Sequence, residues 1–149
     1  PPRSTLFPYT TLFRSALLQV PFVQNMIGFR RTVGVITANK AALTEAHLRA
    51  CGITEDMNVE VMGLEDAPEW GKIFDQPDEA FDIEAVSREI IGVAKEGARR
   101  NPDMGAIVLE CTDLPPYAKR ISEATGLPVF DFVSMMGHVA IALGDIELY

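Results

Sequence analysis

Cys111 is the residue of this sequence whose position favours chemistry most. It follows the apolar run Ala106–Leu109 after a single glutamate, and it precedes Pro115-Pro116, a pair that favours the start of a helix. The N-terminus of a helix carries unpaired N–H groups and a partial positive charge. These groups stabilise a thiolate, and they can also hold a carboxylate or a developing enolate. A cysteine that only fills space at the end of a buried strand explains the position equally well.

The sequence lacks the patterns of several other chemistries. Neither a glycine-rich phosphate loop nor a Gly-x-Ser-x-Gly turn is present, which disfavours dinucleotide enzymes, nucleotide triphosphatases and serine hydrolases. His47 and His138 stand alone, so they predict no metal site. Cys51 lies 60 residues before Cys111, which excludes a disulfide scaffold or a structural zinc site and suits the cytoplasm. We therefore expect neither a cofactor nor a metal.

Apolar runs alternate with amphipathic segments along the chain, which is typical of a parallel α/β sheet with right-handed crossovers. The runs predict buried strands at 32–37, 59–64, 106–109 and 129–133. The amphipathic segments predict helices at 16–29, 41–50, 83–100 and 115–125, and a last helix from 139. The expected fold is a flavodoxin-like (Rossmann-like) three-layer domain whose four strands run in the order 2-1-3-4.

In such sheets ligands bind beyond the carboxyl ends of the strands. Three segments meet there, namely Thr37–Lys40, Glu65–Asp82 and Glu110–Leu114. Glu65–Asp82 is longer than a usual connection, so we expect a loop or short helix over the strand ends. Its large apolar side chains could form a lid over the strand ends, or they could simply anchor an ordinary long connection in the core. These side chains are Trp70, Ile73, Phe74 and Phe81.

Residues 1–15 differ from the rest of the chain. Thr-Leu-Phe occurs twice and Arg-Ser stands at both ends of residues 3–15, without helical or strand periodicity. Translated back into codons, Thr5 to Ser15 resembles a sequencing-library adapter. A signal peptide is disfavoured because Pro8 interrupts the apolar stretch and no initiator Met precedes it. We expect residues 1–15 to lie outside the fold and residues 16–149 to form one α/β domain.

Composition limits the partners of this chain. Its 149 residues are 48% apolar and 23% charged, which suits one domain with a buried core. The formal net charge of −8 disfavours nucleic-acid binding, which needs cations. No apolar run is long enough to span a membrane. We expect a cytoplasmic protein, and the sequence leaves a homo-oligomer open.

The segment Ala106–Tyr117, which reads Ala-Ile-Val-Leu-Glu-Cys-Thr-Asp-Leu-Pro-Pro-Tyr, resembles the second cysteine motif of the aspartate/glutamate racemase family. The resemblance extends over nearly all of residues 16–149, including Leu17–Pro21 and Thr125–Asp131. The run from Glu110 to Tyr117 is its most specific part. The other matching segments are compatible with many parallel-sheet proteins.

The resemblance implies an enzyme of two pseudo-symmetric α/β halves, each of which contributes one cysteine to the cleft between them. One thiolate removes the proton α to a carboxylate and the opposite thiol returns a proton, without cofactor or metal. Cys111 matches the catalytic cysteine of the second half, and Thr112 matches the adjacent hydroxyl that helps to hold the carboxylate. Thr37 and Asn39 match more loosely a loop that faces the substrate. The expected substrate is a small-molecule carboxylate.

This sequence departs from the family at the first cysteine. That cysteine belongs upstream of Leu17–Pro21, where this chain carries the adapter-like residues. We therefore expect a fragment of an amino-acid racemase that is inactive alone. A fragment of a related diacid decarboxylase or isomerase and a non-catalytic α/β binding module are the alternatives.

The same residues predict an activated Cys111 thiol. Strand alternation should turn Glu110 away from Cys111, and Asp113 should cap the helix that Pro115 opens. The helix N-terminus should then lower the pKa of Cys111 below the usual thiol value of roughly 8.5.

Overall fold

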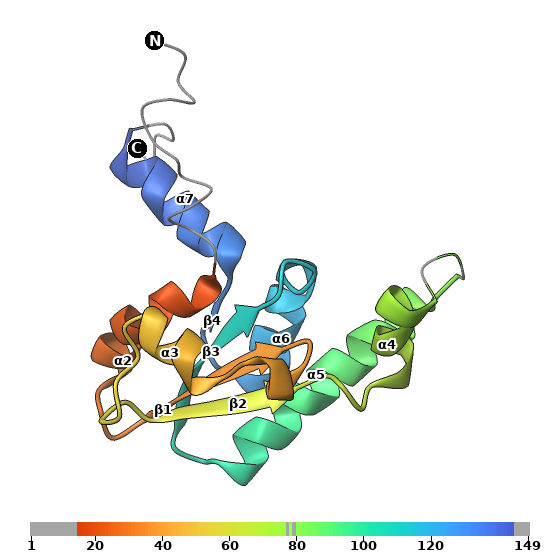
Figure 1. The fold of residues 1–149 in the computed structure, drawn as a ribbon, viewed down its shortest axis with the longest axis horizontal. Coiled ribbons are helices and arrows are strands. Elements are labelled where there is room, and N and C mark those ends of the chain that lie inside the picture. The colour runs from red at the N-terminus through yellow and green to blue at the C-terminus, as the bar shows by residue number, and fades with distance from the viewer. Residues whose placement is uncertain (1–14, 77, 79, 145–149) are drawn as a thin grey trace.

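The computed structural model describes residues 15–76, 78 and 80–144 as a four-stranded sheet between two layers of helices (Figure 1). All four strands are parallel and lie in the order β2-β1-β3-β4, as the sequence predicts. Their bounds are β1 Thr32–Thr37, β2 Val59–Gly63, β3 Met104–Glu110 and β4 Val129–Phe130. Both central strands, β1 and β3, are buried almost throughout, which explains their continuous apolar sequence.

One face of the sheet packs against α4 Pro68–Asp75, α5 Ile83–Arg100 and α6 Ala118–Thr125, with the short 3-10 helix η4 Pro115–Tyr117 before α6. The opposite face packs against η2 Ala16–Gln19, α2 Val20–Ile27 and α3 Glu45–Ala50, while η3 Lys40–Ala42 precedes α3. Successive residues of a strand point to opposite faces of the sheet and therefore into different cores. Ile36 and Leu109 belong to the first, whereas Val35 and Val108 belong to the second.

The helix bounds match the prediction most closely where apolar residues recur at helical spacing over a long segment. α5 spans the predicted residues 83–100, and Val86, Ile90 and Ala94 on one side of it are fully buried. Asp82 begins α5 because its Oδ1 accepts hydrogen bonds from the N–H groups of Glu84 and Ala85, at 2.9 and 3.1 Å. Ile83 differs from the prediction. It lies in the first turn and stays 61% exposed.

The predicted helix at 41–50 is interrupted. η3 covers its first residues and α3 its last six, and only Leu43 and Leu48 of the predicted sheet-facing residues are partly buried. Ala46 and Ala50 are exposed. The interruption follows from Thr44, whose side chain and that of His47 form a capping box that restarts the helix.

The prediction for residues 129–133 is wrong beyond Phe130. β4 has two residues, and α7 Phe132–Ala142 begins where the strand was expected to continue. Asp131 causes the change because its Oδ1 accepts a hydrogen bond of 2.6 Å from the N–H of Ser134, while the Ser134 hydroxyl accepts one from the Asp131 N–H. α7 then extends away from the three layers (Figure 1).

Candidate functional site at the carboxyl ends of the strands

The strand register brings two of the three predicted rim segments side by side. Thr37, the last residue of β1, lies opposite Glu110 of β3 and opposite Gly63 of β2. Cys111 therefore leaves the sheet next to the loop that begins at Ala38. Glu65 joins this rim, since its Oε2 accepts a hydrogen bond of 3.0 Å from the backbone N–H of Lys40.

Cys111 lies half-buried at the end of β3, where it packs against the core that includes α5 and α6. A hollow of about 180 Å³ opens beside it and is walled by Ser15, Ala16, Leu109, Glu110, Cys111, Thr112 and Phe132. Thr112 is exposed, so its hydroxyl can meet a ligand that enters this hollow. We call it the Cys111 hollow.

The prediction of a lowered pKa for Cys111 is wrong, because its surroundings raise the pKa above the usual thiol value. Burial is the largest cause, and the negative charges of Asp113 and Glu110 add to it, although a backbone hydrogen bond from Asp113 acts in the opposite direction. The carboxylate Oδ2 of Asp113 lies 3.9 Å from the Cys111 Sγ. At neutral pH the thiol therefore keeps its proton.

Two features of the chain account for this correction. Asp113 does not cap the following helix, because η4 begins after Leu114 and has no side-chain cap. The α-helix itself starts only at Ala118, seven residues after Cys111. The sulfur thus lies beside a carboxylate, and Cys111 does not belong to the first turn of the α-helix.

Glu110 turns away from Cys111, as strand alternation predicts. Its Oε1 accepts a hydrogen bond of 2.6 Å from the Ser15 hydroxyl, and its Oε2 accepts one of 3.0 Å from the N–H of Leu17. These contacts fasten the start of η2 to the end of β3. Ser15, the last residue of the adapter-like segment, is thereby in contact with the fold.

Thr37 and Asn39 do not line the Cys111 hollow. Thr37 is buried, and strand alternation sets it on the face of Val35 rather than on the face of Cys111. Asn39 uses its side-chain oxygen to cap η3, accepting hydrogen bonds from the N–H groups of Ala41 and Ala42 at 2.9 and 3.3 Å. Of the four predicted site residues, only Cys111 and Thr112 lie together.

The other candidate side chains have local roles. Cys51 is half-buried against the opposite core, with its Sγ 3.8 Å from the Ser15 hydroxyl. His47 completes the cap of α3, and the His138 ring lies near that of Phe22, with centroids 6.2 Å apart and planes tilted by 36°. No cluster of three His, Cys, Asp or Glu that could hold a metal occurs in the described part of the chain.

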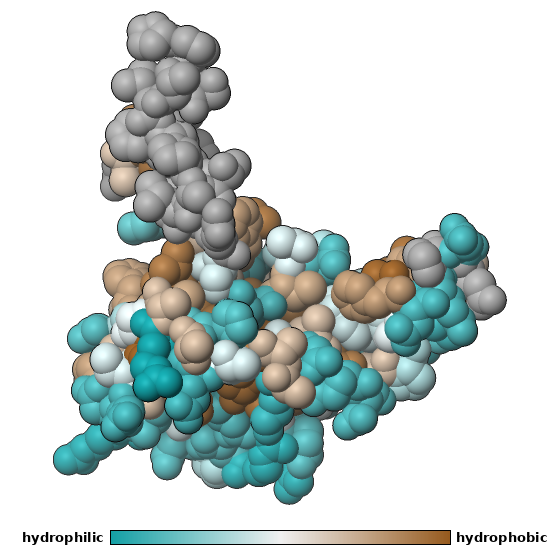
Figure 2. All heavy atoms as spheres, viewed as in Figure 1, coloured by the Kyte–Doolittle hydropathy of each residue, from teal (hydrophilic) through white to brown (hydrophobic). Residues whose placement is uncertain are grey.

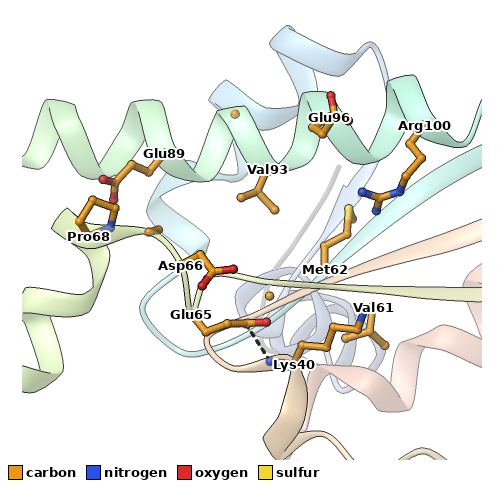
Figure 3. Close-up of a pocket in the computed structure, with 13 residues that line it drawn as sticks. Lys40, Val61, Met62, Glu65, Asp66, Pro68, Glu89, Val93, Glu96 and Arg100 are labelled. Carbon is orange, nitrogen blue, oxygen red and sulfur yellow. Dashed lines mark hydrogen bonds between the residues drawn. The ribbon is translucent and has the colours of Figure 1, made fainter.

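A hollow larger than the Cys111 hollow lies elsewhere, between the outer edge of β2 and α5 (Figure 3). It measures about 520 Å³ and combines carboxylates with an apolar floor. Figure 3 shows the carboxylate of Glu65 directed to the Lys40 backbone and that of Glu89 near Pro68. Glu89 caps α4 from α5, since its Oε2 accepts a hydrogen bond of 2.9 Å from the N–H of Trp70.

A further hollow of about 320 Å³ adjoins the loops after β1 and β2, and we call it the α4 hollow. Trp70 forms part of its wall and is only 2% exposed, so the segment Glu65–Asp82 is anchored in the core, as expected of an ordinary excursion. Phe74 and Phe81 are 54% and 40% exposed. Sequence reasoning missed this hollow, although the spacing of Trp70 and Phe74 by one helical turn was visible.

Comparison with known proteins gives sequence relatives of one kind. No protein-family model matches the chain. It is 30% identical over 132 residues to a dimethylsulfoniopropionate lyase of Durusdinium sp. clade D, covering 86% of this chain and 43% of that protein. It is also 30% identical over 142 residues to dimethylsulfoniopropionate lyase 7 of Emiliania huxleyi, covering 90% and 41%. The chain thus spans about two fifths of the length of these relatives.

Among solved structures, the crystal structure of allantoin racemase from Pseudomonas fluorescens superposes with a TM-score of 0.53 at 20% sequence identity. The match covers 87% of this chain and 52% of that one. The described part of this chain therefore shares its parallel α/β fold with a segment of that racemase. No described helix is long and apolar enough to cross a membrane.

Proposed function

We propose that Cys111 is the base that removes a proton from the carbon α to a carboxylate. The observation that carries this proposal is the position of a half-buried thiol beside the exposed Thr112, in a hollow at the carboxyl end of a central strand. The Thr112 hydroxyl donates a hydrogen bond to the substrate carboxylate and stabilises the enolate as it forms. The raised pKa makes the Cys111 thiolate a stronger base, and it lowers the fraction of Cys111 that is ionised at neutral pH.

The reaction that we favour is elimination from a sulfonium propionate, because the relatives at 30% identity are dimethylsulfoniopropionate lyases. The Cys111 thiolate takes the α-proton, and the electron pair of that C–H bond forms the Cα–Cβ double bond. The Cβ–S bond breaks and its electrons stay on sulfur, so dimethyl sulfide and acrylate result. The leaving group departs neutral, and a single base therefore suffices for this reaction.

Amino-acid racemisation is the second candidate, and the resemblance of Glu110–Tyr117 to the racemase cysteine motif favours it. That reaction needs a proton donor on the face opposite the base. Cys51, the other cysteine, packs against the opposite core, beneath the other face of the sheet. This chain is therefore not expected to racemise an amino acid alone.

We also propose that residues 16–149 form one half of a two-domain enzyme and that the adapter-like residues 1–15 are foreign to its sequence, although Ser15 contacts the fold and residues 1–14 lie outside the described part of the chain. The coverage of 43% and 41% of the lyases and 52% of the racemase supports a missing second half. A cleft closed by that half would exclude water from Cys111 and strengthen the hydrogen bonds to the enolate. The isolated chain should accordingly be a slow catalyst.

The test compares the wild-type chain with Cys111→Ser and Cys51→Ser. Each protein is incubated with dimethylsulfoniopropionate and the headspace is assayed for dimethyl sulfide, while L-aspartate and L-glutamate are assayed in parallel for inversion. We expect slow release of dimethyl sulfide by the wild type and Cys51→Ser, none above background by Cys111→Ser, and no inversion. Equal release by all three proteins would reject the role of Cys111. Inversion without release would favour the racemase candidate.

A further inference from the structure

α7 projects from the three layers, and little of it is covered. Of its residues, all of which the structure describes, Met135 alone is buried. α7 contains no charged residue, and Ser134 and His138 are its polar side chains. An isolated helix of 11 residues is marginal in water, and a helix that is apolar on most sides is normally buried. We therefore expect α7 to have a partner.

The outer face of α7 has the spacing of a helix-pairing seam. Val133, Met136, Ala140 and Leu143 follow one another at intervals of three, four and three residues, which places them on one side of the helix. Val133 and Leu143 are 63% and 58% exposed, and Met136 is exposed as well. This is the spacing of the a and d positions through which one helix packs against another. We call these four residues the α7 seam.

The apolar surface continues from α7 onto the first helices of the fold. A hollow of about 370 Å³ lies between α7 and the pair η2 and α2. Leu18, Phe22 and Met26 recur every four residues along η2 and α2, and all three are exposed. Figure 2 shows hydrophobic residues around the place where α7 leaves the three layers. A partner seated on α7 can therefore also contact this second apolar row.

The charges of the chain lie away from this surface. Residues 16–29 and 132–144 contain no Asp, Glu, Lys or Arg, although 23% of the chain is charged. An apolar and uncharged partner surface fits these residues, whereas a partner recognised by charge does not. Two copies of the chain, each with a net charge of −8, can meet here without bringing like charges into contact.

We propose that α7 is an interface with a second copy of this chain, in which the two α7 seams pack against each other. A seam of this spacing needs an apolar, uncharged helix as its counterpart, and α7 of a second copy supplies one of equal length. A two-fold interface uses the same patch on both subunits, so one element provides both halves of the contact. The pairing does not depend on the proposed function, because it involves no substrate.

The size of the surface predicts a weak pair. α7 is about 17 Å long, whereas a standard interface buries about 800 Å² on each partner. The second apolar row of Leu18, Phe22 and Met26 adds to the contact, but the two short elements that carry it do not make the interface large. We therefore expect an equilibrium between monomer and dimer that shifts with protein concentration.

Sedimentation velocity of the 149-residue chain, from about 5 to about 500 µM, tests the pairing. Val133→Glu and Leu143→Lys each put a charge into the α7 seam. An acidic residue in the first turn and a basic residue at the end of a helix suit the helix dipole, so both variants should keep α7. Ile83→Glu is the matched control, because Ile83 is equally exposed in the first turn of α5, outside this surface.

We expect the average mass of the wild type to rise from 16.4 kDa towards twice that value as the concentration increases. Val133→Glu and Leu143→Lys should each weaken association about tenfold or more, because an unpaired charge is costly to bury. Ile83→Glu should associate as the wild type does. Thermal unfolding gives a second measurement, since the melting temperature should rise with concentration for the wild type and not for the two seam variants.

A wild-type chain that stays at 16.4 kDa at every concentration would overturn the proposal and leave α7 to a different partner, such as a segment of the longer relatives. Association of both seam variants at the wild-type strength would overturn it too, as would equal weakening by Ile83→Glu. None of these outcomes bears on Cys111, because the dimethyl sulfide assay measures its role separately.

Discussion

Burial is the main reason that the Cys111 thiol keeps its proton, and it gives the first prediction at the scale of single residues. In the Cys51→Ser protein only Cys111 can react with iodoacetamide. The labelling rate should rise with pH through a midpoint above the usual thiol value of roughly 8.5, because only the thiolate reacts. Mass spectrometry of the labelled protein gives the rate, with the double variant Cys51→Ser/Cys111→Ser as the blank. A midpoint below the usual value would instead indicate activation by the helix terminus.

Asp113 permits a sharper test of the same environment. Its side chain raises the pKa of Cys111, whereas its backbone N–H lowers it. Asp113→Asn removes the negative charge and keeps the backbone, so the pKa of Cys111 should fall and labelling at pH 8 should become faster. Glu123→Gln, an exposed charge on α6, should leave the rate unchanged. Equal rates for wild type and Asp113→Asn would mean that burial alone governs the thiol.

The sequence predicted the position of Cys111 and the direction of Glu110 but not the state of the thiol. The position of Cys111 could be predicted because the apolar run of β3 is long and ends just before it. The pKa depends on where Asp113 lies after the chain leaves the sheet, and the short η4 turn between Leu114 and Ala118 decides that. Strand alternation places Thr37 on the face of Val35, but only the register of β1 against β3 shows that Cys111 lies on the other face. The cap at Asn39 had a local signal that was overlooked, since Asn is favoured before the first residue of a helix.

At the scale of elements, Gly126 ends α6 in the left-handed conformation, with φ 71°. Gly126→Ala should destabilise the protein by about 1 kcal/mol, because a Cβ disfavours that conformation. Gly92 is the matched control. It lies within α5, and a Cβ there meets no atom within 4 Å, so Gly92→Ala should stabilise the helix by up to about 1 kcal/mol. Urea unfolding measures both changes, and destabilisation of the same size in both variants would contradict this account.

The elements themselves were predictable where local and tertiary preferences agree. α5 has a continuous apolar stripe, an Asp82 cap and a following proline, so its bounds could be read from the sequence. Val129–Val133 was misread because Phe130 and Phe132 alternate around Asp131, which imitates a strand. The overlooked signal was Asp131 with Ser134 three residues later, a pattern that begins a helix.

At the scale of the whole molecule, Glu60 links the edge strand β2 to the end of α5. Burial raises the pKa of Glu60, but hydrogen bonds from Arg100 and Asn101 outweigh it and leave the pKa below its usual value. The Asn101 amide donates to the Glu60 Oε2 at 2.9 Å. A lowered pKa contributes stability above the carboxyl pKa of the unfolded chain, and this contribution is lost as the pH falls through the folded value.

Glu60→Gln should therefore be less stable than the wild type at pH 7, and the difference should shrink as the pH falls below about 4.5. Thermal unfolding followed by circular dichroism from pH 7 to pH 3 measures it. Glu45→Gln, which breaks only an exposed ion pair with Arg49, should differ little from the wild type at any pH. A Glu60→Gln difference that is constant with pH would show that the carboxylate charge does not contribute.

The central claim is that Cys111 takes the α-proton of a carboxylate, and hydrogen exchange tests it most directly because it needs neither a leaving group nor an opposing acid. The wild-type chain, Cys51→Ser and Cys111→Ser are incubated with dimethylsulfoniopropionate in D₂O, and proton NMR follows loss of the α-proton signal. We expect exchange or conversion to acrylate with the wild type and Cys51→Ser, faster at higher pH as Cys111 ionises, and none with Cys111→Ser. Equal loss of the α-proton signal with all three proteins would contradict the account.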